Sequence, residues 1–254
     1  MNEHLDEHYS RLANTYDTTW EHRPDYLEWM AGKIMDSLRP LPGERVADIG
    51  VGTGLFVERL MACATGDAPV LAVDPSQPML DKLPQDPRVR TVRATAEELV
   101  DGRGGFTPEP LDAILIKEAV HHFSDLDRTL SGLAALLAPG GRVLVVTLPP
   151  KIDYPLFPAA IDRFAEGQPE PMDIALALRR AGLDVTASYE RYSVEIQRDN
   201  WLELVRGRWM SVLSTFTDAE LERGLQLIGE AHPQQRISFV ETFAFVLGRL
   251  PDDA

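Results

Sequence analysis

Hydrophobic and polar positions follow two alternating patterns between residues 45 and 148. Short, nearly continuous apolar runs predict buried strands, and apolar positions at helical spacing between them predict helices. This alternation predicts a doubly wound, mostly parallel sheet with helices on both faces. The predicted strands are 45–50, 69–74, 89–93, 111–117 and 142–148; the predicted helices are 55–64, 77–83, 96–100 and 125–137, with a turn at 139–141.

The flanking segments extend this core on both sides. Helical spacing predicts helices at 9–16 and 25–38, and later at 159–165, 172–181, 200–216 and 218–231, the last with Thr217 as its N-cap. Alternating patterns predict two late strands at 184–196 and 236–247. We expect a single domain over 1–254. Its predicted parts are an N-terminal helical lid (1–42), a ligand-binding core (43–150) and a part that completes the sheet (151–254) and carries a helical cap at about 198–232.

Charge and composition narrow the class of partner. The 254 residues include 25 Lys and Arg against 40 Asp and Glu, a net charge of −15, which disfavours binding to nucleic acid or to an anionic membrane. No run of about 18 apolar residues predicts a transmembrane span, and the acidic N-terminus is unlike a signal peptide. The single Cys63 fits a reducing cytoplasm, and the scattered His residues give no metal signature. We expect a cytoplasmic monomer or homodimer.

The segment Asp48-Ile49-Gly50-Val51-Gly52-Thr53-Gly54 links the first strand to the first helix of the core. Glycines there allow a sharp turn and a close approach to a ligand, and Asp74, at the end of the next strand, is placed to bind a ribose diol. Leu55 stands where a nicotinamide-binding turn prefers Gly or Ala, and the Asp48 carboxylate would repel a pyrophosphate. A phosphate-free, cationic nucleoside such as S-adenosylmethionine (SAM) fits better. The alternative is a tight turn without a ligand.

Here the sequence resembles the class I SAM-dependent methyltransferases, of the type that acts on small molecules. Residues 46–54, 72–80 and 93–99 resemble the first three motifs of that family, and 136–141 resembles the turn before its fifth strand. Thr95 departs from the family pattern, in which an Asp near the adenine amine is common. The resemblance covers residues 9–150. It implies a Rossmann-like, seven-stranded sheet with an antiparallel last strand, SAM as cofactor and S-adenosylhomocysteine (SAH) as product.

The resemblance also implies roles for individual residues around the cofactor. Asp74 would hold the ribose, Met79 would pack on the adenine, and Asp48 would lie near the methionine part. Arg23 would pair with the SAM carboxylate, the alternative being a solvated surface cation. Lys117 would meet the same carboxylate or an acidic substrate group, unless it is simply solvated at its strand end. The predicted cofactor-binding residues are Tyr16, Arg23, Asp48, Gly50, Gly52, Asp74, Pro75, Met79, Thr95, Ala96 and Lys117.

Two further groups of residues are candidates for contact with the methyl acceptor. His121 and His122 follow the fourth strand, where open α/β sheets bind ligands, and either could accept a proton near neutral pH. A purely structural role for the pair carries equal weight. In the cap, aromatic rings suit a planar molecule and an arginine suits its carboxylate, although the same rings could simply hold the cap on the sheet. The predicted acceptor-binding residues are Tyr9, Trp201, Arg206, Arg208 and Trp209.

These observations predict an enzyme that transfers the methyl group of SAM to an oxygen or nitrogen of a small molecule by in-line displacement. Two alternatives stay open. One is a SAM-using enzyme that cyclises SAM or transfers its other substituent and releases methylthioadenosine. The other is a non-catalytic SAM-fold module that regulates a partner. The products distinguish the first from methyl transfer.

Overall fold

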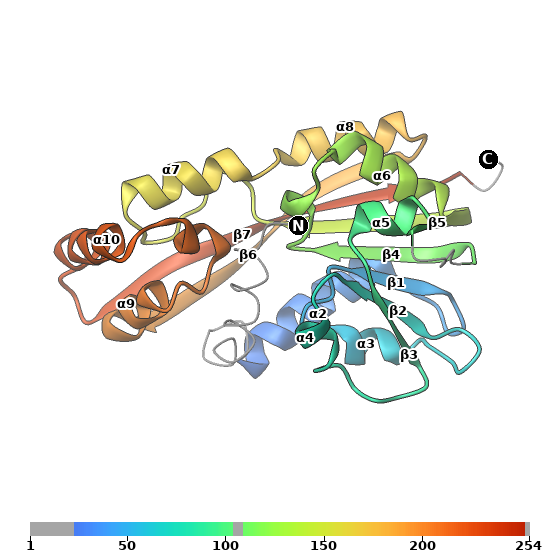
Figure 1. The fold of residues 1–254 in the computed structure, drawn as a ribbon, viewed down its shortest axis with the longest axis horizontal. Coiled ribbons are helices and arrows are strands. Elements are labelled where there is room, and N and C mark those ends of the chain that lie inside the picture. The colour runs from blue at the N-terminus through green and yellow to red at the C-terminus, as the bar shows by residue number, and fades with distance from the viewer. Residues whose placement is uncertain (1–22, 104–108, 252–254) are drawn as a thin grey trace. The chain divides into compact units, whose positions relative to one another are not determined.

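The computed structural model describes residues 23–103 and 109–251 (Figure 1). Tyr9, Tyr16 and the helix predicted at 9–16 lie outside the described residues. The described chain divides into two compact units. The core unit contains residues 27–103, 109–147, 169–190 and 244–251, and the second unit contains residues 23–26, 148–168 and 191–243.

Seven strands form one sheet in the order β3-β2-β1-β4-β5-β7-β6. The neighbours from β3 to β5 pair in parallel, and β7 runs antiparallel to β5 with Val145 opposite Val246. The predicted Rossmann-like fold, with its mostly parallel sheet and antiparallel last strand, is confirmed. The strands are β1 (Val46–Ile49), β2 (Val70–Asp74), β3 (Val89–Arg93), β4 (Leu111–Lys117), β5 (Leu137–Thr147), β6 (Asp184–Gln197) and β7 (Arg236–Arg249).

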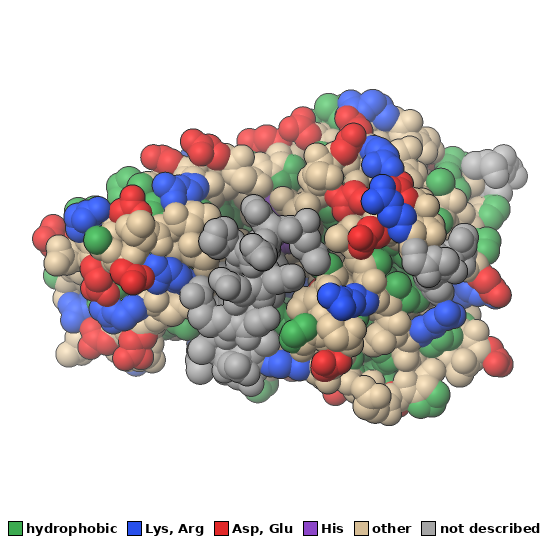
Figure 2. Space-filling view, viewed as in Figure 1, with side chains coloured by type: hydrophobic (Ala, Val, Ile, Leu, Met, Phe, Trp, Pro, Cys, Tyr) green, Lys and Arg blue, Asp and Glu red, His purple; other side chains and the backbone are tan. Residues whose placement is uncertain are grey.

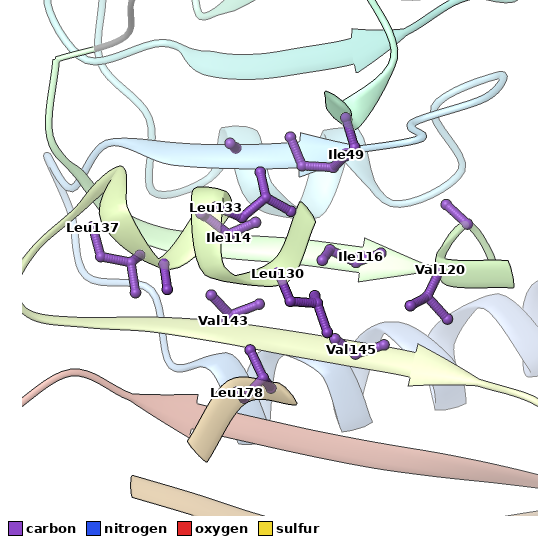
Figure 3. Close-up of a cluster of buried hydrophobic side chains, with 14 of the residues drawn as sticks. Ile49, Ile114, Ile116, Val120, Leu130, Leu133, Leu137, Val143, Val145 and Leu178 are labelled. Atoms are coloured by element: carbon purple, nitrogen blue, oxygen red, sulfur yellow. The ribbon is translucent and has the colours of Figure 1, made fainter. Parts of the chain in front are cut away.

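The centre of this sheet is buried on both faces, as the continuous apolar runs predict. Every residue of β1 and β2 is buried, and a cluster of branched side chains joins the strands to α6 and α8 on one face (Figure 3). The helices of the core unit are α2 (Pro24–Leu38, which begins in the second unit), α3 (Val57–Met61), α4 (Gln77–Leu80), α5 (Ala96–Val100), α6 (Leu126–Ala135) and α8 (Pro171–Arg180), with the 3₁₀ turn η4 (Val120–His122).

β5 begins at Leu137, earlier than the predicted start at 142, and contains the predicted turn at 139–141. Leu111 of β4 pairs with Leu137 and Ala113 pairs with Arg142, so the four intervening residues of β5 loop out of the pairing, with a φ of 73° at Gly140. Regular pairing with β4 resumes at Arg142, where the strand was predicted to begin.

The second unit contains α7 (Pro158–Gly167), α9 (Arg198–Arg206), the 3₁₀ turn η5 (Ser211–Thr215) and α10 (Asp218–Ala231). The single helix predicted over 200–216 is wrong: α9 ends at Arg206, Gly207 is its C-cap, and Arg208 has a φ of 55°. A left-handed residue cannot continue a right-handed helix, so the chain turns there before η5. Thr217 caps α10 as predicted, through a reciprocal pair of hydrogen bonds with Glu220. Among the described residues, no helix combines the length and apolar character needed to cross a bilayer.

Candidate functional site

The glycine-rich turn after β1 is fastened to the end of the neighbouring strand. The backbone N–H groups of Gly50 and Val51 donate to the carbonyl of Val73, over 2.8 and 3.0 Å. Gly50 and Gly52 have φ values of 74° and 55°, a region that favours glycine. A Cβ on Gly50 would overlap the side chain of Ala119, whereas a Cβ on Gly52 would have no neighbour within 4 Å. The turn therefore packs tightly at Gly50 and leaves open space at Gly52.

Asp74 ends β2 directly beside this turn. Its Oδ2 accepts a hydrogen bond from the Gly52 N–H over 2.9 Å, and its Oδ1 accepts one from the Ser76 N–H over 2.8 Å. Burial raises the pKa of the Asp74 carboxyl above its usual value, and the two N–H donors partly oppose this shift. The backbone N–H groups of Gly52 and Ser76 therefore hold the Asp74 carboxylate beside Gly52, where the turn is open to a ligand.

Asp48 and Lys117 bring a second acid and a cation to the ends of adjacent strands. Asp48 is 5% exposed, and burial raises the pKa of its carboxyl to about 7; the positive charge of Lys117 lowers it and the negative charge of Asp74 raises it. The Lys117 Nζ lies 5.5 Å from the centre of the Phe56 ring. Asp48, Asp74 and Lys117 therefore form one electrostatically coupled group beside the turn.

The residues predicted to bind adenine lie around α4 and α5. Met79 is 3% exposed in α4, and the Pro75 carbonyl accepts a hydrogen bond from Arg93 Nε over 3.2 Å. Thr95 is the N-cap of α5: its hydroxyl accepts from the Glu98 N–H, and the Glu98 carboxylate accepts from the Thr95 N–H. Because the Thr95 hydroxyl serves this capping box, we expect backbone groups at Thr95 and Ala96, rather than that side chain, to meet an adenine.

His121 and His122 lie in η4, immediately after the end of β4. Glu118 introduces this turn with a φ of 52°, and Ala119 is the residue that packs on Gly50, which connects the histidine segment to the glycine turn. Nδ1 of His121 is buried and has no hydrogen-bond partner among the described residues. Burial lowers the pKa of His121 to about 4, so its imidazole is neutral at pH 7.

His122 is the more exposed ring of the pair. The two ring centres are 4.0 Å apart. Burial first, and then the neighbouring His121 charge, lowers the pKa of His122 as well. A neutral imidazole with a free buried nitrogen can accept a proton, and His121 fits this description best.

The predicted residues of the second unit have structural partners. Trp201 is fully buried and its Nε1 donates to the Pro155 carbonyl over 2.8 Å, while the Trp209 ring packs on it with centres 4.9 Å apart. Arg206 pairs with Glu222 over 3.1 Å, and Arg208 pairs with Asp218 over 2.9 Å. The Arg23 Nε is buried with no hydrogen-bond partner in the described part of the chain, and it lies 4.0 Å from an oxygen of Asp25. The ligand contacts of these residues stay predictions.

Sequence reasoning missed two polar residues of the second unit. The Tyr154 hydroxyl donates a hydrogen bond to the carboxylate of Glu241, which is 1% exposed. The pattern of the last strand, β7, could have indicated Glu241. Ile237, Phe239, Glu241 and Phe243 occupy its buried alternate positions, and Glu241 is the charged residue in that apolar row.

Comparisons with known proteins give this geometry a family. Residues 47–143 match a family model described as a methyltransferase domain. A ubiquinone biosynthesis O-methyltransferase from Rhizobium leguminosarum bv. trifolii is 34% identical over 122 residues, which are 46% of this chain and 45% of that protein. Over residues 47–143 the chain therefore resembles a methyltransferase domain. The chain spans about half the length of the curated relatives that it matches first.

Solved structures share the fold of this chain over a longer range. The YcgJ protein from Bacillus subtilis has a TM-score of 0.63 and 19% identity, over 88% of this chain and 99% of that chain. Phosphoethanolamine N-methyltransferase 2 from Haemonchus contortus, in complex with SAM, has a TM-score of 0.56 and 17% identity, over 94% of this chain and 60% of that chain. At these identities the likeness concerns the fold.

The residues beside the glycine turn fit SAM, the cofactor of this methyltransferase family. The turn is open at Gly52, where the backbone can lie against a ligand without a Cβ in between. The carboxyls of Asp48 and Asp74 suit a ligand that carries an ammonium, a sulfonium and a ribose diol, and they oppose a phosphate. The open backbone and the two carboxyls thus agree with the cofactor that the family uses.

Proposed function

We propose that this chain transfers a methyl group from SAM to an oxygen or nitrogen atom of a small molecule. The observation that carries the proposal is the turn at Gly50–Gly52, open to a ligand at Gly52 and flanked by the buried carboxyls of Asp48 and Asp74. The names of the relatives support the reaction class, since the one from Rhizobium is an O-methyltransferase and the one from Haemonchus an N-methyltransferase.

The proposed cofactor contacts follow the chemistry of the groups present. Asp74 would accept hydrogen bonds from the ribose hydroxyls, and Asp48 would attract the ammonium of the methionine part. The adenine would lie near Met79, Pro75 and the backbone of Thr95 and Ala96. The predicted contributions of Tyr16, Arg23 and Lys117 to the methionine carboxylate belong to the same proposal.

When bound, SAM supplies an activated methyl group on a positively charged sulfur, so the protein chiefly has to align the acceptor and exclude water. We propose that His121 takes the proton that the acceptor hydroxyl or amine must lose. Its imidazole is neutral at pH 7, and its buried Nδ1 has no hydrogen-bond partner within residues 23–103 and 109–251; both observations support this role. His122 is the alternative proton acceptor from the same turn.

A small-molecule acceptor is also supported by the distribution of charge. The net charge is −15, and on the face shown in Figure 2 basic side chains are interspersed with acidic ones rather than gathered in one basic patch. Such a surface offers little attraction to a polyanion. A cytoplasmic location belongs to the same proposal, supported by the single cysteine.

Titration calorimetry and product analysis test the proposal. We expect SAM and SAH to bind and NAD not to bind, and we expect Asp74→Asn to weaken SAM binding while the exposed Asp67→Asn leaves it unchanged. Incubation with SAM and candidate acceptors should release SAH. Release of methylthioadenosine would indicate a different SAM reaction. Binding of SAM without product in any metabolite extract would favour a regulatory module.

A further inference from the structure

Glu97 connects helix α5 to the segment that carries the two histidines. One oxygen of its carboxylate, Oε1, accepts two hydrogen bonds from Ser124, over 2.9 Å from the backbone N–H and over 3.2 Å from the hydroxyl. Ser124 ends the histidine turn, residues 118–124, which contains η4. Hydrogen bonds to a carboxylate are stronger than those between neutral groups, and two from one residue fix its position. Glu97 therefore holds the end of the histidine turn against α5.

A second polar contact and a close packing contact join α5 to α6, the helix that follows the histidine turn. Asp101, the C-cap of α5, pairs with Arg128 of α6. A Cβ on Gly132 of α6 would lie 2.7 Å from the Cβ of Val100, so the two helices approach as closely as a glycine allows. The histidine turn thus leads into a helix that is itself held on α5, and Glu97 supplies the contact nearest in sequence to the histidines.

The charge of Glu97 also acts on the second histidine of the turn. Burial lowers the pKa of His122 most and the charge of His121 lowers it further, whereas the negative charge of Glu97 raises it. The carboxylate therefore acts on the histidine turn at two points, by hydrogen bonds at Ser124 and through its charge at His122.

On its other side, Glu97 directly follows the residues whose backbone is proposed to meet the adenine. Thr95 is the N-cap of α5 and Ala96 its first residue, so Glu97 lies in the first turn of the same helix. The Thr95 hydroxyl and the Glu98 carboxylate serve the capping box, whereas the Glu97 carboxylate reaches across to the histidine turn. The proposed adenine contact and the contact with the histidine turn are therefore made by adjacent residues of one helix.

We propose that Glu97 is a positioning residue that keeps His121 and His122 in a fixed place relative to α5. The proposal rests on the proposed function in one respect, since it treats a histidine of this turn as the proton acceptor. Such a group must lie within hydrogen-bond reach of the methyl acceptor, and a displacement of about 1 Å can cost about a hundredfold in rate. Because Glu97 acts through Ser124, its loss should reduce kcat and leave cofactor binding nearly unchanged.

Hydrogen exchange of single amides, followed by NMR on the full chain, tests the contact without any methyl acceptor. The N–H groups of His122 and Phe123 donate to carbonyls of the turn itself rather than to Glu97. We expect Glu97→Ala to speed exchange at these two amides, and at Ser124, by at least about tenfold, since the whole turn loses its support. Unchanged exchange, or faster exchange at Ser124 alone, would overturn the inference, because the turn would then keep its place without Glu97.

A conservative variant and a matched control refine this test. Glu97→Gln keeps an oxygen that can accept from Ser124, so exchange should stay within about threefold of that in the natural chain. Exchange as fast as in Glu97→Ala would contradict a role through these hydrogen bonds. Glu58 is an exposed glutamate in the first turn of α3, and Glu58→Ala should leave exchange in the histidine turn unchanged.

A milder variant keeps the test decisive if Glu97→Ala does not fold, which thermal unfolding would show. Ser124→Ala removes one of the two donors to Glu97 and leaves the other. We expect it to speed exchange at His122 and Phe123 by about threefold. Unchanged exchange at these two amides would overturn the inference.

Kinetics distinguish a positioning role from a merely structural contact. With a methyl acceptor, Glu97→Ala should lower kcat by at least about tenfold and keep the SAM Kd within about threefold, and Glu97→Gln should restore most of the lost rate. An unchanged kcat, or equal losses in kcat and in SAM affinity, would overturn the inference. A natural chain that binds SAM and releases no SAH with any acceptor refutes the proposed function instead, and the exchange results then decide whether Glu97 positions the turn.

Discussion

Replacing Asp48 by Asn should stabilise the protein considerably more at pH 8 than at pH 5. Burial raises the pKa of the Asp48 carboxyl to about 7 from its usual 3.8. Between these two pKa values the folded state holds a proton that the unfolded state has lost, so stability is lost progressively as the pH rises from about 4 to 7. The amide that replaces the carboxyl has no proton to lose in this range, and the variant should escape this part of the pH dependence.

The magnitude follows from the shift. A change of about 3 pKa units corresponds to about 4 kcal/mol in the free energy of unfolding once the pH exceeds the folded pKa. The attraction of Lys117 is already contained in this value, since it is one of the causes of the final pKa. We therefore expect Asp48→Asn to gain up to about 4 kcal/mol at pH 8 and about 1.5 kcal/mol at pH 5, less whatever the amide loses in local hydrogen bonding.

Urea unfolding followed by tryptophan fluorescence measures this difference at pH 5 and pH 8. The exposed Asp67→Asn is the control and should show no pH-dependent difference from the natural chain. The substitution should affect SAM binding in the opposite direction: calorimetry should show weaker binding of SAM to Asp48→Asn than to the natural chain. The natural chain itself should bind SAM more tightly as the pH rises through 7 and Asp48 loses its proton. Equal stability differences at the two pH values would refute the reasoning, because they would mean that Asp48 does not titrate near 7.

Three further substitutions probe the glycine turn, a helix cap and the proposed proton acceptor. Gly50→Ala should cost at least about 2 kcal/mol, because the new Cβ overlaps Ala119 and the φ of 74° disfavours alanine; an unchanged midpoint of thermal unfolding would contradict this. Thr217→Ala should cost about 1 kcal/mol in urea unfolding by removing the hydroxyl that accepts from the Glu220 N–H, and no loss would show that the cap is dispensable. His121→Asn should lower kcat and leave the SAM Kd unchanged, and the acid limb of the natural chain's kcat profile should fall only near pH 4, where His121 gains its proton; equal losses in kcat and in SAM affinity would indicate a structural role.

The fold of the core unit could be predicted because its elements are encoded locally. Residues 70–74 and 111–117 are apolar runs of strand length, and the structure forms β2 and β4 from them. The errors concern where elements begin and end. Leu137 pairs with β4 ahead of the turn at Gly140, and the residues themselves do not show that β5 begins there. Gly207, in contrast, is an ordinary helix-ending signal that a stricter reading of 200–216 would have used.

The contacts of the two units differ in how far the sequence predicts them. The glycine turn is one contiguous segment, and Asp74 at the end of the next strand accepts a hydrogen bond from its Gly52 N–H, as neighbouring parallel strands lead one to expect. The polar pair of the second unit is created only by folding, since Tyr154 and Glu241 are 87 positions apart in the chain. The same limit applies to Arg208, since its pairing with Asp218 depends on where α9 ends.

Some of the acidic residues of this chain are buried in its interior. Three acids, Asp48, Asp74 and Glu241, are at most 8% exposed, and burial of a carboxyl is unfavourable unless a partner compensates. Glu241 accepts a hydrogen bond from the Tyr154 hydroxyl. In the proposed complex, a sulfonium and an ammonium would compensate Asp48 and Asp74. Since surface charges are screened by salt and buried ones much less, binding of a cationic cofactor should depend on these two side chains and not on the net charge of −15. The proposed binding of SAM therefore has a physical basis in buried carboxyl groups that gain a partner when a cation binds.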